Sequence, residues 1–278
     1  MKNKLWQSKF EIIRINGEGT KSFLHGQTTS DFKSAKEGQV IRSCWLSTTG
    51  QLLSVLEVYI DEKGAEILVL GGKAQDLVEG FNKVIFPADE VYIESISTSL
   101  RAQIMDLDIS WKDSNYTFLK VDQKYSEFIK NQEIGTAEEV KLWKSKQGIL
   151  LDSKLYKKFN NPFEIGIGDF ISLDKGCYLG QEAVSRFIRS DKLRQQLIYW
   201  EAESSKSIDD EKELSTGMPI INSEGTKSGE ILTITKNGNS LTGLALIKTN
   251  HMKCMLALLL NESLTIDIHK PKGFFHKD

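Results

Sequence analysis

The sequence predicts a fold of the α+β class that ends in a β-rich region. Before Arg194, apolar runs of the strand type are mixed with segments of helical spacing, and a turn at residues 61–64 separates two of the strands, which indicates a hairpin rather than a regular parallel sheet. After Arg194, short β-like runs alternate with glycines and polar stretches, a pattern typical of a small closed or sandwiched β domain. A chain of 278 residues is long enough for two or more compact units.

The first region is expected to begin with a strand, a turn and a short helix. Residues 10–15 are rich in apolar side chains, residues 17–19 turn the chain, and Thr20 is the predicted N-cap of a helix that contains Phe23 and Leu24. Further predicted strands occupy residues 52–60, 66–70, 91–96, 102–106 and 117–121. Helices are predicted over residues 73–84, 125–132 and 137–147.

The second region is expected to be almost entirely β. Residues 204–215 are polar and rich in charge, so they are predicted to form an exposed loop. The strands predicted after it cover residues 218–221, 229–235, 241–248, 255–260 and 264–268. The resulting division places one region at residues 1–195 and the other at residues 196–278.

Composition and charge exclude several classes of protein. Charged residues make up 27% and hydrophobic residues 40% of the chain, as in ordinary globular proteins. The net charge of −2 disfavours a broad nucleic-acid surface, and the longest apolar run is far too short to cross a bilayer. Residues 1–10 lack the apolar run of a signal peptide. Three cysteines at unrelated spacings form no disulfide framework, so we predict a cytoplasmic protein that has no membrane partner.

The most informative stretch reads Lys-Gly-Cys-Tyr-Leu-Gly-Gln-Glu and runs from Lys175 to Glu182. It places Cys177 between Gly176 and Gly180, where the backbone can take angles that other residues avoid or a ligand can approach closely. A helix is predicted directly afterwards, over residues 181–189. The partial positive charge of a helix N-terminus lowers the pKa of a nearby thiol, so the setting suits a reactive thiolate. A buried structural thiol remains the alternative for Cys177.

Basic residues follow this motif. Arg186 and Arg189 lie on the predicted helix, away from its apolar face, and Lys192 and Arg194 come next. Such a patch could meet an anionic ligand or RNA phosphates, and a solvated helix face is the simpler interpretation. Other catalytic motifs are absent: the sequence contains no Walker phosphate loop, no Cys-x-x-Cys, no His-Glu-x-x-His and no Gly-x-Ser-x-Gly.

The cysteine motif resembles that of the YgfZ family, which is related to the glycine-cleavage T-protein GcvT, an aminomethyltransferase. The family signature is Lys-Gly-Cys-Tyr-x-Gly-Gln-Glu, and all seven fixed positions match here. They are Lys175, Gly176, Cys177, Tyr178, Gly180, Gln181 and Glu182. T-proteins lack this motif.

Other segments resemble the family in the same order. The stretch with Gln27 and Asp31 is similar to Phe-Leu-Gln-Gly-Gln-x-Thr-x-Asp, although His25 stands where the family more often has Gln. Residues 48–51 lack the two basic residues of the family's Pro-Lys-Gly-Arg segment. Glu164 lies in a stretch that resembles the Pro-x-Glu segment shared with T-proteins.

The resemblance implies a three-part ring in which two interleaved α+β parts and a C-terminal β-barrel surround a central channel. It also implies tetrahydrofolate, or a derivative, as the cofactor. The expected folate-binding residues are Gln27, Asp31, Glu164, Lys175, Gly176, Tyr178, Gly180, Gln181, Glu182 and Arg186. Cys177 is the expected working thiol, in an accessory protein that supports the assembly or repair of iron–sulfur clusters, including those of tRNA-modifying enzymes. The implied partners are iron–sulfur proteins or cluster-assembly factors.

Two other functions stay open at this point, so the sequence leaves undecided whether the chain is an enzyme. One is folate-dependent aminomethyl transfer of the T-protein type, for which Asp76 would have to serve as the positioning aspartate. Lys73 could then contact the folate tail. The other is a cysteine nucleophile that is paired with a histidine, and the candidates are His25, His251, His269 and His276.

Overall fold

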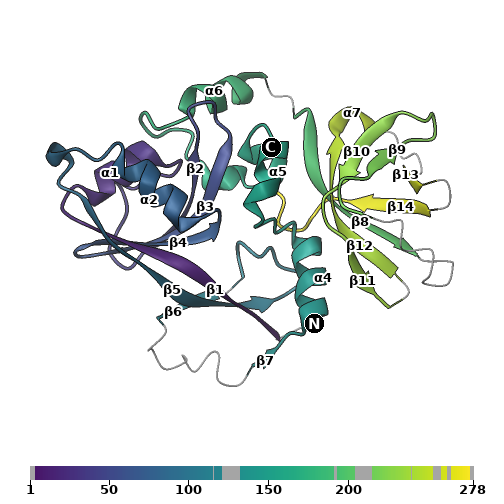
Figure 1. The fold of residues 1–278 in the computed structure, drawn as a ribbon, viewed down its shortest axis with the longest axis horizontal. Coiled ribbons are helices and arrows are strands. Elements are labelled where there is room, and N and C mark those ends of the chain that lie inside the picture. Colours follow the sequence, from purple (N-terminus) through teal and green to yellow (C-terminus); the bar gives the residue numbers. More distant parts are fainter. Residues whose placement is uncertain are drawn as a thin grey trace.

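The computed structural model describes residues 4–114, 116–120, 132–190, 193–203, 215–238, 240–252, 258–261 and 264–275. It contains two seven-stranded sheets with helices around the first of them, which confirms the α+β class. Figure 1 shows the two sheets on opposite sides of the molecule, with helices between them. In the described part of the chain, no helix is long and apolar enough to cross a membrane.

The first sheet has the strand order β2-β3-β4-β1-β5-β6, and β7 pairs with the start of β1. These strands are β1 (Lys4–Asn16), β2 (Val40–Leu46), β3 (Leu52–Asp61), β4 (Gly64–Gly71), β5 (Tyr92–Met105), β6 (Tyr116–Lys120) and β7 (Glu133–Ile134). The predicted hairpin is confirmed, because β3 pairs antiparallel with β4. The sequence analysis did not predict β2.

Strand β5 is longer than predicted. The two strands expected at residues 91–96 and 102–106 are one continuous strand, and that part of the prediction is wrong. The reason is its partner, β1, which pairs with it from Lys4↔Met105 to Asn16↔Tyr92. Backbone hydrogen bonds to β1 therefore hold the polar middle of β5 in the sheet, although its side chains lack the apolar alternation of a strand.

Helices α1 (Thr20–Gln27) and α2 (Ala74–Asn82) pack on the sheet through Leu24, Leu77 and Phe81, which are fully buried. The predicted N-cap is wrong, since Gly19 caps α1 and the Thr20 hydroxyl donates to the carbonyl of Gly17 at 2.8 Å. A short 3-10 helix, η1 (Pro87–Asp89), follows α2. The predicted helix at residues 125–132 lies almost wholly outside the described residues.

Five further helical segments lie between the two sheets in sequence. Helix α4 (Ala137–Gln147) has the predicted bounds, because Thr136 and Glu139 form a capping box at its start and Gly148 ends it at φ +72°. After η2 (Ser153–Lys158), α5 (Pro162–Ile165) and η3 (Gly168–Phe170), the chain enters α6 (Gln181–Ser190).

The second sheet consists of β8 (Gln195–Glu203), β9 (Pro219–Ile221), β10 (Lys227–Ile231), β11 (Thr235–Asn237), β12 (Ser240–Lys248), β13 (Leu258–Asn261) and β14 (Leu264–His269), with α7 (Thr249–Met252) after β12. Its order is β10-β9-β13-β14-β8-β12-β11, and β10 also pairs with β12. Six strands thus form a closed circuit of pairing, as in a small barrel. The ring with a central channel and the division at residue 195 stay predictions.

The C-terminal segment returns from the second sheet to the helices in the middle of the molecule. The backbone amides of Lys272 and Gly273 donate to carbonyls at the end of α4, and that of Phe275 donates to Gly166 at 2.9 Å. The Phe274 ring is buried in the largest hydrophobic cluster, which also contains side chains from α4, α5 and both sheets. The two sheets are therefore joined by a shared core.

Candidate functional site

The cysteine motif forms an irregular loop between η3 and α6 that is fixed against α1 and the β2–β3 turn. The amide of Leu179 donates to the carbonyl of Gly26 at 3.0 Å. Gly180 has φ +83°, and a Cβ atom there would lie 2.7 Å from the carbonyl oxygen of Ser47. Glycine is therefore required at position 180 both by its backbone angles and by the close approach of the turn.

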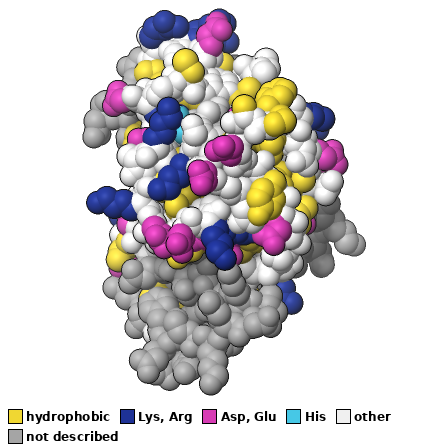
Figure 2. Space-filling model, turned by 90° about the vertical axis from the view of Figure 1, so that its left-hand side faces the viewer, with side chains coloured by type: hydrophobic (Ala, Val, Ile, Leu, Met, Phe, Trp, Pro, Cys, Tyr) yellow, Lys and Arg dark blue, Asp and Glu magenta, His cyan; other side chains and the backbone are white. Residues whose placement is uncertain are grey.

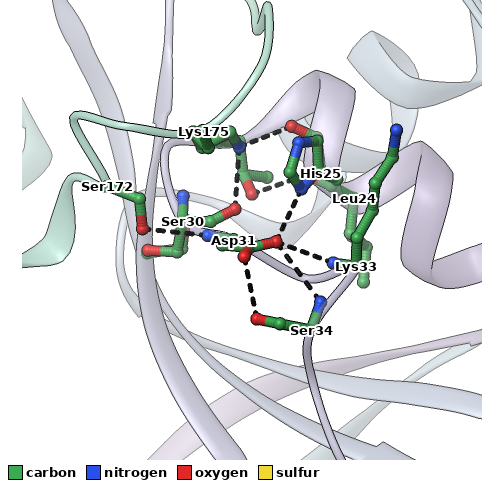
Figure 3. A network of polar contacts seen from close by, with 10 residues as sticks. Leu24, His25, Ser30, Asp31, Lys33, Ser34, Ser172 and Lys175 are labelled. Carbon is green, nitrogen blue, oxygen red and sulfur yellow. Dashed lines mark hydrogen bonds and ion pairs between the residues drawn. The ribbon is translucent and has the colours of Figure 1, made fainter.

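Lys175 attaches the motif to the chain that follows α1. Its Nζ donates to the carbonyls of Thr28 and Ser30, each at 2.7 Å, and to that of His25 (Figure 3). The ammonium group also lies 4.8 Å from the centre of the Tyr178 ring. Burial lowers the pKa of Lys175 to about 8. Because three carbonyls already surround this ammonium group, Lys175 holds the loop in place and does not extend toward solvent.

His25 and Asp31 form a polar pair beside Lys175. His25 Nδ1 lies 2.9 Å from Asp31 Oδ1, and Asp31 also accepts from the Lys33 amide and the Ser34 hydroxyl (Figure 3). Burial, followed by the charge of Lys175, lowers the pKa of His25, so the ring is neutral near pH 7. The hydrogen bond from Ser34 is the main cause that holds the pKa of Asp31 below its usual value.

Cys177 is exposed, which excludes the buried structural thiol as its state in this fold. It does not lie in the first turn of a helix, because α6 begins four positions later, at Gln181, after the turn that Gly180 makes. The start of α6 at Gln181 is the predicted one, and the effect of its N-terminus on the thiol stays a prediction. Cys44, by contrast, lies in the core, where burial raises the pKa of its thiol.

Tyr178 and Glu164 are buried and serve the interior of the fold. Burial raises the pKa of Tyr178 to about 12, so the phenol is neutral. Glu164 on α5 accepts from the side chain of Asn160 at 2.9 Å and from that of Gln195, at the start of β8, also at 2.9 Å. The Glu164 carboxylate thus connects the helical middle of the molecule to the second sheet.

The remaining predicted site residues lie nearer the surface. Glu182 and Arg186 form an i,i+4 pair at 2.8 Å on the exposed side of α6, with side chains that are 82% and 75% exposed. Gln181 and Gln27 are half-buried, at the start of α6 and the end of α1. The opposite face of α6 is apolar as predicted, and Phe187 lies 5.0 Å from Phe163 between ring centres.

The residues named for the two alternatives lie on different elements, and among them His25, on α1, lies beside Lys175 of the cysteine loop. Asp76 and Lys73 are exposed at the start of α2, and His251 and His269 contact Ser228 and Glu201 in the second sheet. His276 lies outside the described residues. Within the described ranges, no group of three His, Cys, Asp or Glu side chains could hold a metal ion.

The sequence analysis missed a second polar cluster. Glu57 and Arg101 are fully buried and joined at 2.8 Å, and Arg42 donates to the same carboxylate at 2.9 Å. The signal was present, because a glutamate inside an apolar strand must be paired when it is buried. Arg42 of this cluster also lines a pocket of about 370 Å³, together with Asp31, Lys112 and Phe170, among others.

The face that carries α1 and α2 shows positive and negative side chains interspersed with hydrophobic ones (Figure 2). In the segment that follows α2, residues 83–96, the exposed large hydrophobic side chains are Val84, Phe86, Tyr92 and Ile96.

Comparison with known proteins found two curated relatives, and no family model matches the chain. One is a chloroplastic protein of Arabidopsis thaliana named a putative transferase, which is 27% identical over 87% of this chain. The chain spans 64% of the length of that relative. The other is the tRNA-modifying protein YgfZ of Buchnera aphidicola, which is 20% identical over 69% of this chain and 70% of its own length.

Among solved structures, the chain resembles the glycine cleavage system aminomethyltransferase T of Bartonella henselae. The TM-score is 0.69, and the match covers 98% of this chain and 88% of the other at 12% sequence identity. At this identity the likeness establishes the fold. The relatives, this fold and the motif from Lys175 to Glu182 together support a YgfZ/GcvT-like family for this chain.

Proposed function

We propose that this chain is a tetrahydrofolate-binding accessory protein for iron–sulfur proteins, and that Cys177 is its working thiol. The observation that carries the proposal is the presentation of this cysteine. Lys175, Tyr178 and Gly180 are fixed to the body of the protein, whereas Cys177, between them, is exposed to an incoming partner. The name of the YgfZ relative, a tRNA-modifying protein, supports tRNA-modifying cluster enzymes as the partners.

A shared role suits the cysteine content of the chain. Protein-bound iron–sulfur clusters are usually held by four cysteine thiolates, and this sequence has three cysteines, of which Cys44 is in the core. Cys177 would therefore supply one thiolate to a cluster, or to its iron or sulfur, and the partner would supply the rest.

The residues near Asp31 fit a folate. A pterin ring offers N–H donors and a flat face, and the glutamate tail of a folate is anionic. The 370 Å³ pocket is lined by the Asp31 carboxylate, by the cations of Arg42 and Lys112, which also pair with Glu57 and Asp169, and by the edge of the buried Phe170 side chain. Its volume lies within the range of small-molecule sites. Of the predicted folate-binding residues, Asp31 is the one that lines this pocket, so the pocket supports that assignment and leaves the others as predictions.

The test separates folate binding from the role of the thiol. Tetrahydrofolate is titrated calorimetrically into the wild-type protein and into Cys177→Ser, and both are then assayed for support of an iron–sulfur tRNA-modifying enzyme in cells that lack the endogenous protein. We expect the two proteins to bind tetrahydrofolate with the same affinity, while Cys177→Ser supports no enzyme activity. The matched control is Asp174→Asn, an exposed change in the same loop that should leave both functions intact. Full support by Cys177→Ser would remove the thiol from the proposal.

Aminomethyl transfer is the second candidate, and the aminomethyltransferase fold together with the transferase name of the plant relative supports it. Asp76 is accessible in the first turn of α2, as a positioning carboxylate would have to be. This candidate predicts one-carbon transfer from a lipoyl-linked aminomethyl donor to tetrahydrofolate, and loss of that transfer in Asp76→Asn. An absence of turnover with a fully loaded donor would exclude it.

A further inference from the structure

One edge of the first sheet is open over part of its length. Strand β5 pairs with β1 from Tyr92 to Met105, whereas β6 covers its other side only from Ser99 to Gln103. Among the residues that the structure describes, no strand pairs with residues 92–98 on that side. Residues 94–98 are all exposed, although a strand with one buried face hides every second side chain. We call residues 92–98 the open edge, because their outward backbone groups lack a described partner strand.

The open edge carries few of the features that keep other strands away. Proteins usually protect such edges with lysines, prolines or bulges. Residues 95–98 read Ser-Ile-Ser-Thr, without charge or proline, and Ile and Thr are residues that favour strands. The one shift in register with β1 lies before them, where Glu94 is the extra residue between the partners of Arg14 and Ile15. This stretch is therefore suited to receive a further strand.

A groove of about 780 Å³ lies along one face of the open edge. Ser95 and Ser97 line it, together with their β1 partners Arg14 and Ile12. The charged residues of the lining are Glu37, Asp61, Glu62, Glu66, Arg14 and Lys63. Arg14 is neutralised by Asp61, since its Nη2 donates to Asp61 Oδ1 at 2.9 Å. The groove keeps an excess of negative charge and thus attracts positive charge.

The other face of the open edge is apolar. Ile96 lies opposite Ile13 of β1, which belongs to the hydrophobic cluster under α1 and α2, and Ile96 is nevertheless 40% exposed. The segment that leads from α2 to β5 also exposes Val84 and Phe86. Large exposed hydrophobic side chains that gather in one part of a protein are typical of an interaction surface. A strand added to β5 would therefore meet an acidic groove on one side and an apolar surface on the other.

We propose that the open edge of β5 binds an extended segment of a partner protein by strand addition, and that basic and apolar residues alternate in that segment. Successive side chains of a strand point to opposite faces, so the basic ones would reach the groove and the apolar ones would cover Ile96. A second copy of this chain lacks that complementarity, because its own open edge offers Glu94 and serines and no positive charge. This inference goes beyond the proposed function and does not depend on it.

The first experiment measures the fluorescence anisotropy of a labelled peptide, Lys-Val-Lys-Val-Lys-Val-Lys, against the full chain, with Glu-Val-Glu-Val-Glu-Val-Glu for comparison. We expect the basic peptide to bind at least roughly tenfold more tightly than the acidic one. Glu37→Lys combined with Glu62→Lys, two exposed changes at the groove, should weaken the basic peptide by roughly tenfold. Glu224→Lys combined with Asp267→Lys is the matched control, since it makes the same charge change at exposed positions of the second sheet region and should leave binding unchanged.

The second experiment tests strand pairing and needs no variant to fold. Two versions of the basic peptide carry N-methyl groups, one on its lysines and the other on its valines. These two sets of N–H groups point to opposite sides of an extended strand, so strand addition uses only one of them. One version should therefore lose roughly tenfold or more in affinity, because its hydrogen bonds to β5 are removed, while the other binds like the parent.

Three results would overturn the proposal: no binding of the basic peptide, equal affinity for the acidic peptide, or two methylated peptides that bind alike. Sedimentation of the chain alone should show a monomer. A dimer that Ile96→Asp dissociates would assign the open edge to a second copy and would overturn the proposed occupant. None of these measurements uses folate, the Cys177 thiol or an iron–sulfur cluster, so failure here is distinct from failure of the proposed function.

Discussion

At the scale of single residues, the motif combines residues that hold the loop with one that is presented to solvent. Tyr178 and Gly180 are required by packing and backbone geometry, and Lys175 by three carbonyls. The motif from Lys175 to Glu182 is therefore explained by the structure of its loop as much as by the chemistry of its thiol. The sequence singled out Cys177 through its motif. It could not show that Lys175 holds the loop, because the carbonyls that Lys175 contacts belong to residues 25–30, far away in the chain.

The first prediction concerns Lys175. Replacing it by Met keeps an unbranched apolar stem and removes the ammonium group, which leaves the carbonyls of Thr28 and Ser30 without their donor. Hydrogen bonds to a charged group contribute about 2 kcal/mol, and we expect the free energy of unfolding to fall by about that amount. Urea unfolding measures it, with Lys157→Met, an exposed lysine on η2, as the control. A loss no larger than that of the control would show that the three carbonyls are satisfied in another way.

At the scale of elements, the ends of a helix could be predicted where the capping residues lie within the segment itself. Helix α4 was predicted to the residue, because its capping box and its terminal glycine are local. The length of β5 was not predictable, because β1, about ninety residues earlier in the chain, supplies its partner. The start of α6 at Gln181 was predictable from its helical period, but the turn before it depends on how close Ser47 comes to Gly180, which no local pattern shows.

The second prediction tests that turn. Gly180→Ala places a methyl group 2.7 Å from the carbonyl oxygen of Ser47, whereas Gly217, at a similar φ of +89°, has no atom near enough to meet a Cβ. Gly217→Ala should therefore cost only the backbone strain, about 1–2 kcal/mol. Gly180→Ala should cost about 1–3 kcal/mol more, and thermal unfolding of both variants gives the difference. Equal losses of stability in the two variants would mean that the β2–β3 turn moves to accommodate the methyl group. Ser47 would then not fix the position of the loop.

At the scale of the whole molecule, the second sheet is joined to the first region by contacts that no local pattern could reveal. Glu164 contacts Gln195 at the start of β8, and the segment after β14 returns to α4 and α5. Gly166, at φ +84°, lets the Phe274 ring pass so close that a Cβ there would lie 2.4 Å from it. The cysteine loop leads directly from η3 into α6, so its position depends on this shared core.

The third prediction follows from Phe274, which is only 7% exposed in the core that contains residues of both sheets. Phe274→Ala removes a large side chain from the place where the regions meet, and we expect it to lower the free energy of unfolding by about 3–4 kcal/mol. Phe86→Ala, at an exposed site, should change it by no more than about 0.5 kcal/mol. Because the lost contacts join the two sheets, calorimetry of Phe274→Ala should also separate one cooperative transition into two. A single transition at the wild-type temperature would show that the core does not couple the sheets, and the position of Cys177 would then depend on the first sheet alone.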